Sequence, residues 1–277
     1  VGAPIRVGSG PVAIAAGGGG VWVALASGSV VRIDPRTMRR VGASIPVVDP
    51  GGIAVDGDRV WVTSRAQDEL LRIDARSGRT TGPAIPVGAK PTDVAAGLGG
   101  VWVANSADGT VTHVDPDTGR ADEPIHVARH RALNPGNGGR PVEQPGGAEV
   151  LGLTVGEGAV WVAKTDSVQT TTIQVRRIDP RTRRVTGDPI AVDGGIPMHL
   201  AAGGGGVWVT DVGSLPPGAP PRRPALQRID PGTRRVSGDP IPLGRQPAGL
   251  AVGPTGVWVA EAGENSVDQI GAGGGRG

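Results

Sequence analysis

The sequence predicts an all-β propeller of six blades, with four antiparallel strands in each blade. The tripeptide Val-Trp-Val occurs six times, and its tryptophans are the only aromatic residues of the chain: Trp22, Trp61, Trp102, Trp161, Trp208 and Trp258. A proline lies eleven residues before five of them, at Pro11, Pro50, Pro91, Pro197 and Pro247. Glycine-rich turns recur in the same frame. A repeat of about forty residues that reads as four short strands is typical of a propeller.

The third copy shows the four strands of one repeat. They are expected at Pro91–Ala96, Val101–Ala104, Thr110–Val114 and Pro124–Val127. An Asp-Gly pair separates the second strand from the third, and this dipeptide favours a tight hairpin turn. The segment Asp115–Arg120 has proline and glycine where the next turn requires them. Each tryptophan lies in the middle of a second strand between valines, which predicts packing between blades and not ligand stacking.

The two ends of the chain complement each other. Val1–Gly8 matches the fourth strand of other repeats, at Thr81–Gly88 and Ser237–Gly244, whereas the last copy stops after Val267–Ile270. We expect the N-terminal segment to complete the sixth blade, because closure removes exposed sheet edges. This gives a single domain over residues 1–270, followed by a flexible glycine-rich tail at 271–277. Seven blades are the alternative if Ala128–Gly147 forms extra strands, but its many glycines and prolines argue against strands there.

Composition excludes several classes of function. The net charge of +2 is too small for a nucleic-acid footprint, and the absence of other aromatics removes stacking platforms for single strands. Without cysteine there is no disulfide framework or thiol chemistry. No apolar run is long enough for insertion in a membrane. Because the chain begins at Val1 and shows no signal-peptide pattern, we expect an excised domain or a mature chain. No phosphate-binding, calcium-loop or catalytic motif occurs, so we expect no cofactor, no metal and no catalytic residue.

Every large insertion falls on one face. In a propeller the loops between second and third strands share a face with the loops that join successive blades, and this is called the insertion-bearing face below. The distance from a tryptophan to the Ile or Val that ends the third strand is eleven or twelve residues in four copies. It is 17 from Trp161 to Ile178 and 21 from Trp208 to Ile229. The third insertion is Ala128–Gly147. Loops that lengthen on one face of a rigid scaffold usually carry recognition.

Two aligned positions break the repeat near the expected axial mouth of this face. At the position two residues after the proline, four copies have a small residue, whereas the third and fifth copies have Asp93 and His199. Three residues after tryptophan, the last four copies carry polar residues. The predicted binding site for a small ligand or a protein partner is therefore Asp93, Asn105, Lys164, Asp211, His199 and Glu261. A plain solvated rim is the alternative. Protonation of His199 near neutral pH would make binding pH-dependent. His113, His126 and His130 lie on a third strand, a fourth strand and an insertion, so no second histidine joins it.

The repeat Pro-x-x-Val-Ala-x-Gly-x-Gly-Gly-Val-Trp-Val-Ala-Asn, continued by Asp-Gly-Thr-Val and Asp-Pro-x-Thr-Gly-Arg between Pro91 and Arg120, resembles YncE-like and NHL-type propeller repeats of high-GC bacteria. This resemblance covers nearly the whole chain. It implies a non-enzymatic binding module, monomeric and extracytoplasmic, such as the sensor part of a membrane-anchored Ser/Thr kinase. A free secreted binding protein is an alternative with the same resemblance.

The virginiamycin B (streptogramin) lyases are also similar. Their repeats carry Trp-x-x-Glu, which only Trp258-Val259-Ala260-Glu261 matches in this chain. That resemblance implies a metal-dependent enzyme as a further alternative. Such lyases have seven blades and hold magnesium with several Glu and His residues, whereas this chain counts six blades and one His at the mouth.

Overall fold

The structure, a computed structural model, describes residues 5–127, 130–133, 141–144, 150–165, 172–193, 197–211, 213, 222–261, 263–264 and 266–271, without the side chains of 130–133, 141–144, 172, 197 and 198. The described residues form strands and turns only, and none of them belongs to a helix able to cross a membrane. The chain divides into two compact units, Val1–Pro124 and Ile125–Gly277. The prediction of a single domain over residues 1–270 stays a prediction.

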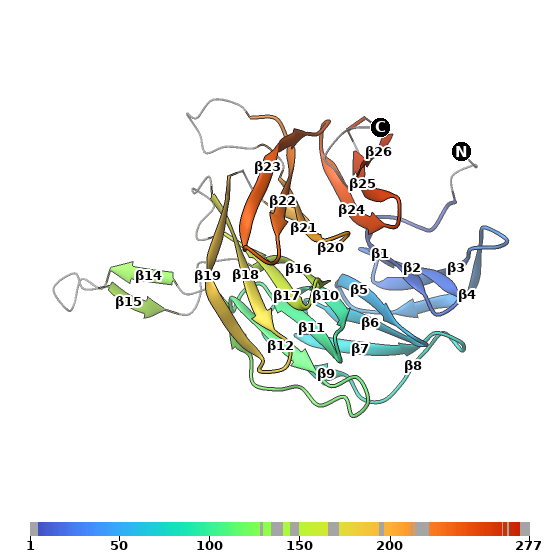
Figure 1. The fold of residues 1–277 in the computed structure, drawn as a ribbon. Helices are drawn as coiled ribbons and strands as arrows, with labels where there is room; N and C mark the ends of the chain where they lie inside the picture. Colours follow the sequence, from blue (N-terminus) through green and yellow to red (C-terminus); the bar gives the residue numbers. More distant parts are fainter. Residues whose placement is uncertain are drawn as a thin grey trace. The chain divides into compact units, whose positions relative to one another are not determined.

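The first unit carries three antiparallel sheets in chain order (Figure 1). The first sheet is β1 (Pro11–Gly17), β2 (Gly20–Leu25), β3 (Ser29–Asp34) and β4 (Arg39–Pro46). The second is β5 (Pro50–Asp56), β6 (Arg59–Ser64) and β7 (Glu69–Asp74), with its outer strand broken into β8 (Arg79–Thr80) and β9 (Ile85–Pro86). The third is β10 (Pro91–Gly97), β11 (Gly100–Asn105) and β12 (Thr110–Val114).

The second unit carries the remaining sheets. β13 (Ile125–His126) is fourth in the strand order of the third sheet. The fourth sheet is β16 (Val150–Gly156), β17 (Ala159–Lys164), β18 (Thr172–Asp179) and β19 (Arg184–Asp193). The fifth is β20 (Pro197–Gly203), β21 (Gly206–Asp211), β22 (Ala225–Asp230) and β23 (Arg235–Pro242). The sixth has three described strands, β24 (Pro247–Gly253), β25 (Gly256–Glu261) and β26 (Ser266–Ile270).

This strand order confirms the predicted fold class, an all-β propeller with six blades of the four-stranded antiparallel type. One correction concerns the insertion Ala128–Gly147, which contains the strands β14 (His130–Leu133) and β15 (Pro141–Gln144). They pair only with each other as a two-stranded sheet, so they add no seventh blade. Residues 5–10 form no strand and residues 1–4 lie outside the described part, so closure of the sixth blade by Val1–Gly8 stays a prediction. Most of the predicted glycine tail (272–277) also lies outside it.

The predicted role of the tryptophans is confirmed for five of them. Trp22, Trp61, Trp102, Trp161 and Trp208 are 0–1% exposed, and Trp22, for example, packs with residues of the next blade such as Ile53 and Val60. Trp258 is the exception, with 37% of its surface exposed. Its sheet is the last in the chain, and no later sheet of its own unit covers that side.

The turns between third and fourth strands repeat one hydrogen-bonding pattern. In each, an aspartate oxygen accepts backbone N–H groups two or three residues later, for example 2.8 Å from Thr118 N to Asp115 Oδ1. These bonds favour the carboxylate form, and they lower the pKa of the turn aspartates Asp34, Asp74, Asp115, Asp179 and Asp230 below the ordinary value of 3.8. These hydrogen bonds therefore hold the turns that join the third strand to the fourth.

Candidate functional site

The structure corrects the expected position of four predicted site residues. The polar side chains three residues after tryptophan were expected around an open rim, yet they are buried: Asn105 is 0%, Lys164 4%, Asp211 3% and Glu261 2% exposed. These four residues therefore form no solvated rim, whereas Asp93 and His199 are partly exposed. Each of the four buried residues ends a second strand, and for Asn105 and Glu261 the loop before the blade lies against that end, at Gly88 and Gly244.

The hydrogen bonds of these buried groups show how the loops are held. Asn105 donates from Nδ2 to the hydroxyls of Thr110 and Thr112, 2.9 Å away in each case. Glu261 Oε1 accepts from Gly244 N at 2.7 Å, and a Cβ at Gly244 would overlap the Glu261 carboxylate. The Glu261 carboxylate therefore holds the loop that leads into β24 of its own blade.

The other two members of this series lie in the second unit. Asp211 Oδ1 accepts from Gly213 N at 2.7 Å, at the start of the long loop of the fifth blade. Lys164 ends β17 and lies opposite Val150 on one side and Gln174 on the other. Residues 212, 214–221 and 166–171 of the two long loops lie outside the described residues.

Asp93 lies in the first unit, on β10. Its side chain is partly buried, and Oδ1 accepts from Val94 N at 2.9 Å. The neighbouring blade is close at this point, because a Cβ added to Gly52 would lie 2.7 Å from Asp93 Cα. Asp93 and Asn105 therefore share the end of the β10–β11 hairpin, whereas Lys164, His199, Asp211 and Glu261 belong to the second unit.

His199 is the predicted residue with the most unusual surroundings. It lies on β20 directly opposite Thr210 of β21, beside a bulge in the register. Directly opposed residues of an antiparallel pair point to the same face of the sheet. Thr210 shares that face with Trp208, which packs with Val257 and Val259 of the sixth blade. The His199 and Thr210 side chains therefore face the sixth blade together.

Both side chains bury a polar atom without a hydrogen-bond partner in the described part of the chain. These atoms are His199 Nε2 and Thr210 Oγ1, and Thr210 as a residue is 0% exposed. A buried polar group without a partner costs about 1–3 kcal/mol, so native structures rarely keep one without a reason. Among the seven such atoms of the described residues, these two are distinguished because they belong to directly opposed residues.

The second blade provides the comparison. Thr63 stands there in the position of Thr210, and Gly52 in the position of His199. Gly52 N donates to Thr63 Oγ1 at 2.8 Å, so the hydroxyl is satisfied within the blade. Replacement of the glycine by histidine thus coincides with the loss of this bond.

Burial lowers the pKa of His199 below its ordinary value of 6.5, because desolvation penalises the imidazolium. The imidazole is therefore neutral at neutral pH, with one nitrogen that donates and one that accepts. This corrects the expectation of protonation near neutral pH, since the change of charge moves to more acidic solutions. A neutral His199 beside the Thr210 hydroxyl can exchange hydrogen bonds with hydroxyl, amide or carboxylate groups.

Sequence reasoning missed a second unusual histidine. In the third blade His113 is 4% exposed, and its Nδ1 lies 2.6 Å from Asp122 Oδ2. Its ring is 4.6 Å from that of Trp102, centroid to centroid. The sequence does mark this histidine, because the residue opposite the tryptophan is an arginine in four blades. Along the chain these residues are Arg32, Arg72, His113, Arg177, Arg228 and Gln269.

No cluster of three or more potential metal ligands occurs among the described residues. Glu261, which matches the Trp-x-x-Glu of the lyases, lies at the Gly244 backbone.

Comparison with solved structures supports the fold. The chain is similar to a Kuenenia stuttgartiensis hydrazine synthase, with a TM-score of 0.76 and 17% identity over 97% of this chain and 78% of that one. The Neurospora crassa Pan2 WD40 domain gives 0.60 and 15% over 90% and 71%. The computationally designed Ika8 protein gives 0.61 and 15% over 93% and 69%. No protein-family model and no curated protein matches the chain. At these identities the likeness concerns the fold alone.

Proposed function

We propose that this propeller is a non-enzymatic binding module whose ligand site includes His199 and Thr210 on the fifth blade. A propeller is in general a scaffold for binding and interaction. The observation that carries the proposal is the pair of buried, unpartnered atoms, His199 Nε2 and Thr210 Oγ1. The long loop of the fifth blade begins after Asp211, which follows Thr210 in the sequence.

The proposed ligand carries a neutral or anionic polar group that both accepts and donates hydrogen bonds. A cation is disfavoured, because burial already disfavours the positive charge of His199. Asp93, Asn105, Lys164 and Glu261 have a different role in this proposal. Three of the four are buried, and they support the loops on which ligand or partner contacts are presented.

The finer part of the proposal concerns the parent protein. The resemblance to YncE-like and NHL-type repeats favours an extracytoplasmic sensor or interaction domain, monomeric by itself and attached to a signalling part such as a Ser/Thr kinase. The gene that encodes the chain tests this: a transmembrane segment and a kinase upstream of Val1 would support it. A free-standing gene with a signal peptide would favour a secreted binding protein.

A ligand screen tests the site. Thermal shift with a library of polar metabolites identifies ligands of the parent chain, and calorimetry then compares variants. We expect His199→Ala and Thr210→Val to weaken binding about tenfold each, the loss of one hydrogen bond to a buried group. His126→Ala, at an exposed histidine of β13, is the matched control and should bind as the parent.

Two results would overturn the proposal. In the first, a confirmed ligand binds His199→Ala, Asp93→Ala and a variant with a shortened 215–223 loop as tightly as the parent, while changes in the turns of the opposite face abolish binding. In the second, the protein shows magnesium-dependent turnover of a cyclic depsipeptide antibiotic, which would make it a lyase.

A further inference from the structure

A second site lies in the first unit, in a groove between the first and second blades. The groove has a volume of about 400 Å³, within the range of small-molecule sites. Its walls are the outer strand β4 and the turn before β8, and Arg32 and Trp22 line its inner end. This groove is called the Arg32 groove below. It shares no residue with the His199 site.

The charged residues that line the Arg32 groove are all arginines. They are Arg32, Arg76 and Arg79, and no acidic residue lines the groove. Segments 32–40 and 72–79 hold seven arginines and two aspartates, although the first unit as a whole (residues 1–124) has 12 basic and 13 acidic residues. Positive charge is therefore concentrated at this groove and does not reflect the composition of the unit.

The two aspartates of these segments are already engaged. Asp34 Oδ1 accepts from Arg36 N, and Asp74 Oδ1 accepts from Ser77 N, each at 2.7 Å. They reduce the local positive charge, but neither forms an ion pair with the groove arginines among the described residues. Ion pairs occur elsewhere in the unit, for example at Arg59 and Arg65.

Arg32 breaks the repeat at its hydrogen-bonding partner. In the second, fourth and fifth blades the equivalent arginine reaches a hydroxyl of the fourth strand or the segment that continues it, at Thr81, Thr186 and Ser237. In the first blade the residue opposite Arg32 is Val41, which has no polar group. Arg32 therefore lacks the side-chain partner that its counterparts have.

Arg32 is nevertheless held in place. Its guanidinium lies 5.3 Å from the centroid of the Trp22 ring, and its Nη atoms reach the carbonyl oxygens of Gly19 (3.2 Å) and Arg76 (3.4 Å). An arginine has five N–H donors, so these two bonds leave donors unused. A fixed guanidinium with unused donors is pre-organised for an oxyanion, which it binds in a planar, bidentate manner.

Ser44, Ser77 and Thr80 also line the groove. The Ser77 hydroxyl donates to Asp74 Oδ1 and the Ser44 hydroxyl accepts from Arg40, so the arginines are the main donors for a ligand.

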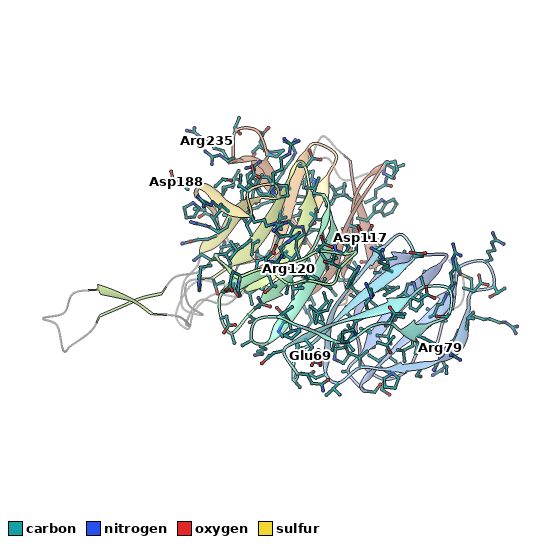
Figure 2. The ribbon with its side chains drawn as sticks, turned by 90° about the horizontal axis from the view of Figure 1, so that it is seen from below. Glu69, Arg79, Asp117, Arg120, Asp188 and Arg235 are labelled. Atoms are coloured by element: carbon teal, nitrogen blue, oxygen red, sulfur yellow. The ribbon has the colours of Figure 1, made fainter. Side chains whose placement is uncertain are left out.

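Arg79 is exposed at the groove, and Arg120, its counterpart at the same turn position of the third blade, lies well apart from it (Figure 2). Of these two turns, only the turn with Arg79 faces an arginine, Arg32, that lacks a hydrogen bond to another side chain.

We propose that the Arg32 groove binds a multivalent oxyanion, such as a phosphate ester or a polycarboxylate, between Arg32, Arg76 and Arg79. The proposal is independent of the proposed function, because the site lies on different blades and takes a different class of ligand. Failure of one leaves the other untouched.

The experiment measures binding of inorganic pyrophosphate and of citrate to the full chain by calorimetry, at low ionic strength. We expect a dissociation constant below about 1 mM for at least one of them, with the stronger ligand distinguishing phosphate from carboxylate chemistry. The Arg76→Gln/Arg79→Gln variant should bind about tenfold or more weakly. Arg120→Gln removes one positive charge at the matched turn of the third blade, at the position equivalent to Arg79, and should bind as the parent.

A second variant tests the role of Arg32 without removing it. Val41→Thr is nearly isosteric and supplies a hydroxyl opposite Arg32, as the second, fourth and fifth blades have opposite their arginines. We expect it to engage Arg32 and to weaken anion binding about threefold, with no loss of stability. The proposal is overturned if neither anion binds below about 1 mM. It is also overturned if Arg120→Gln weakens binding as much as the Arg76→Gln/Arg79→Gln variant does.

Discussion

His113 Nδ1 lies 2.6 Å from Asp122 Oδ2, and this pair replaces the arginine–hydroxyl pair of the second, fourth and fifth blades. In the fifth blade, for example, Arg228 Nη1 donates to Ser237 Oγ at 3.0 Å. Arg228 lies 5.8 Å from the Trp208 centroid, just as His113 lies against Trp102. Both arrangements place a hydrogen-bonded polar group over a buried indole.

This equivalence predicts a compensating double substitution. His113→Arg alone puts a longer side chain against Asp122, and Asp122→Thr alone removes the carboxylate partner of a buried histidine. We expect each single variant to lose about 1–3 kcal/mol in the free energy of unfolding. The double variant restores the arginine–threonine pair of the second blade, so it should recover most of that loss. Urea unfolding of the four proteins gives the coupling energy, and strictly additive losses would contradict the equivalence.

His199 predicts a specific dependence of stability on pH. Burial lowers its pKa in the folded state below 6.5, whereas the unfolded chain takes up a proton as the pH falls through 6.5. The unfolded state therefore binds more protons in this window, and stability falls as the pH drops from 6.5 toward the lowered folded value. Above 6.5 the group contributes no pH dependence.

The measurement is the melting temperature between about pH 7.5 and about pH 5.5. We expect the parent to lose roughly 2–4 °C more than His199→Gln across this range. His126→Gln, at an exposed position, should follow the parent. Identical curves for His199→Gln and the parent would show that His199 is not desolvated in solution.

The turns between third and fourth strands predict a stabilising substitution. Met38 adopts φ 54°, and Gly78 at the same turn position of the second blade adopts φ 66°. In both turns this residue donates its N–H to the aspartate carbonyl four residues earlier, at 2.9 Å. Residues other than glycine pay an energetic cost in this left-handed region. We expect Met38→Gly to raise the free energy of unfolding by about 0.5–1 kcal/mol, after the entropy gained by the unfolded chain.

The matched reverse change is Gly78→Ala. A Cβ there would meet only Ile45 Cδ1, at 4.0 Å, so the backbone conformation dominates the effect. We expect a loss of about 1 kcal/mol by chemical denaturation. Changes of the same sign in both variants would contradict the assignment of the effect to the backbone.

Much of the fold could be predicted because the sequence repeat is regular. The spacing of eleven residues between proline and tryptophan determines where the first and second strands lie, and five of the six tryptophans are core residues as the valines beside them indicate. The sites were harder. A polar residue at a strand end resembles a solvent-exposed one, and only the folded loop shows that Glu261 binds Gly244 N. The pairing of His199 with Thr210 follows a register bulge that recurs in the first strand of all six blades, and the spacing of residues in the sequence does not by itself show which residues it brings together.

Trp258 tests how the last blade is covered in solution. Trp161 is 0% exposed and packs among residues of the fourth and fifth blades, whereas Trp258 is 37% exposed. Replacement of a fully buried large side chain by alanine loses both the transfer free energy and the packing around the cavity. We expect Trp161→Ala to lose about 3–5 kcal/mol in the free energy of unfolding. Trp258→Ala should lose markedly less, roughly half as much, because part of its ring is already in water.

Urea unfolding of both variants, together with the parent, gives the comparison. Trp208→Ala is the matched control, since Trp208 is 1% exposed and lies on the preceding blade of the same unit. It should behave as Trp161→Ala does. The fluorescence of Trp258 gives a second readout, because a partly hydrated indole emits at longer wavelength than a buried one and is quenched by iodide. Equal losses for Trp258→Ala and Trp208→Ala, with no quenching, would mean that another segment covers Trp258 in solution.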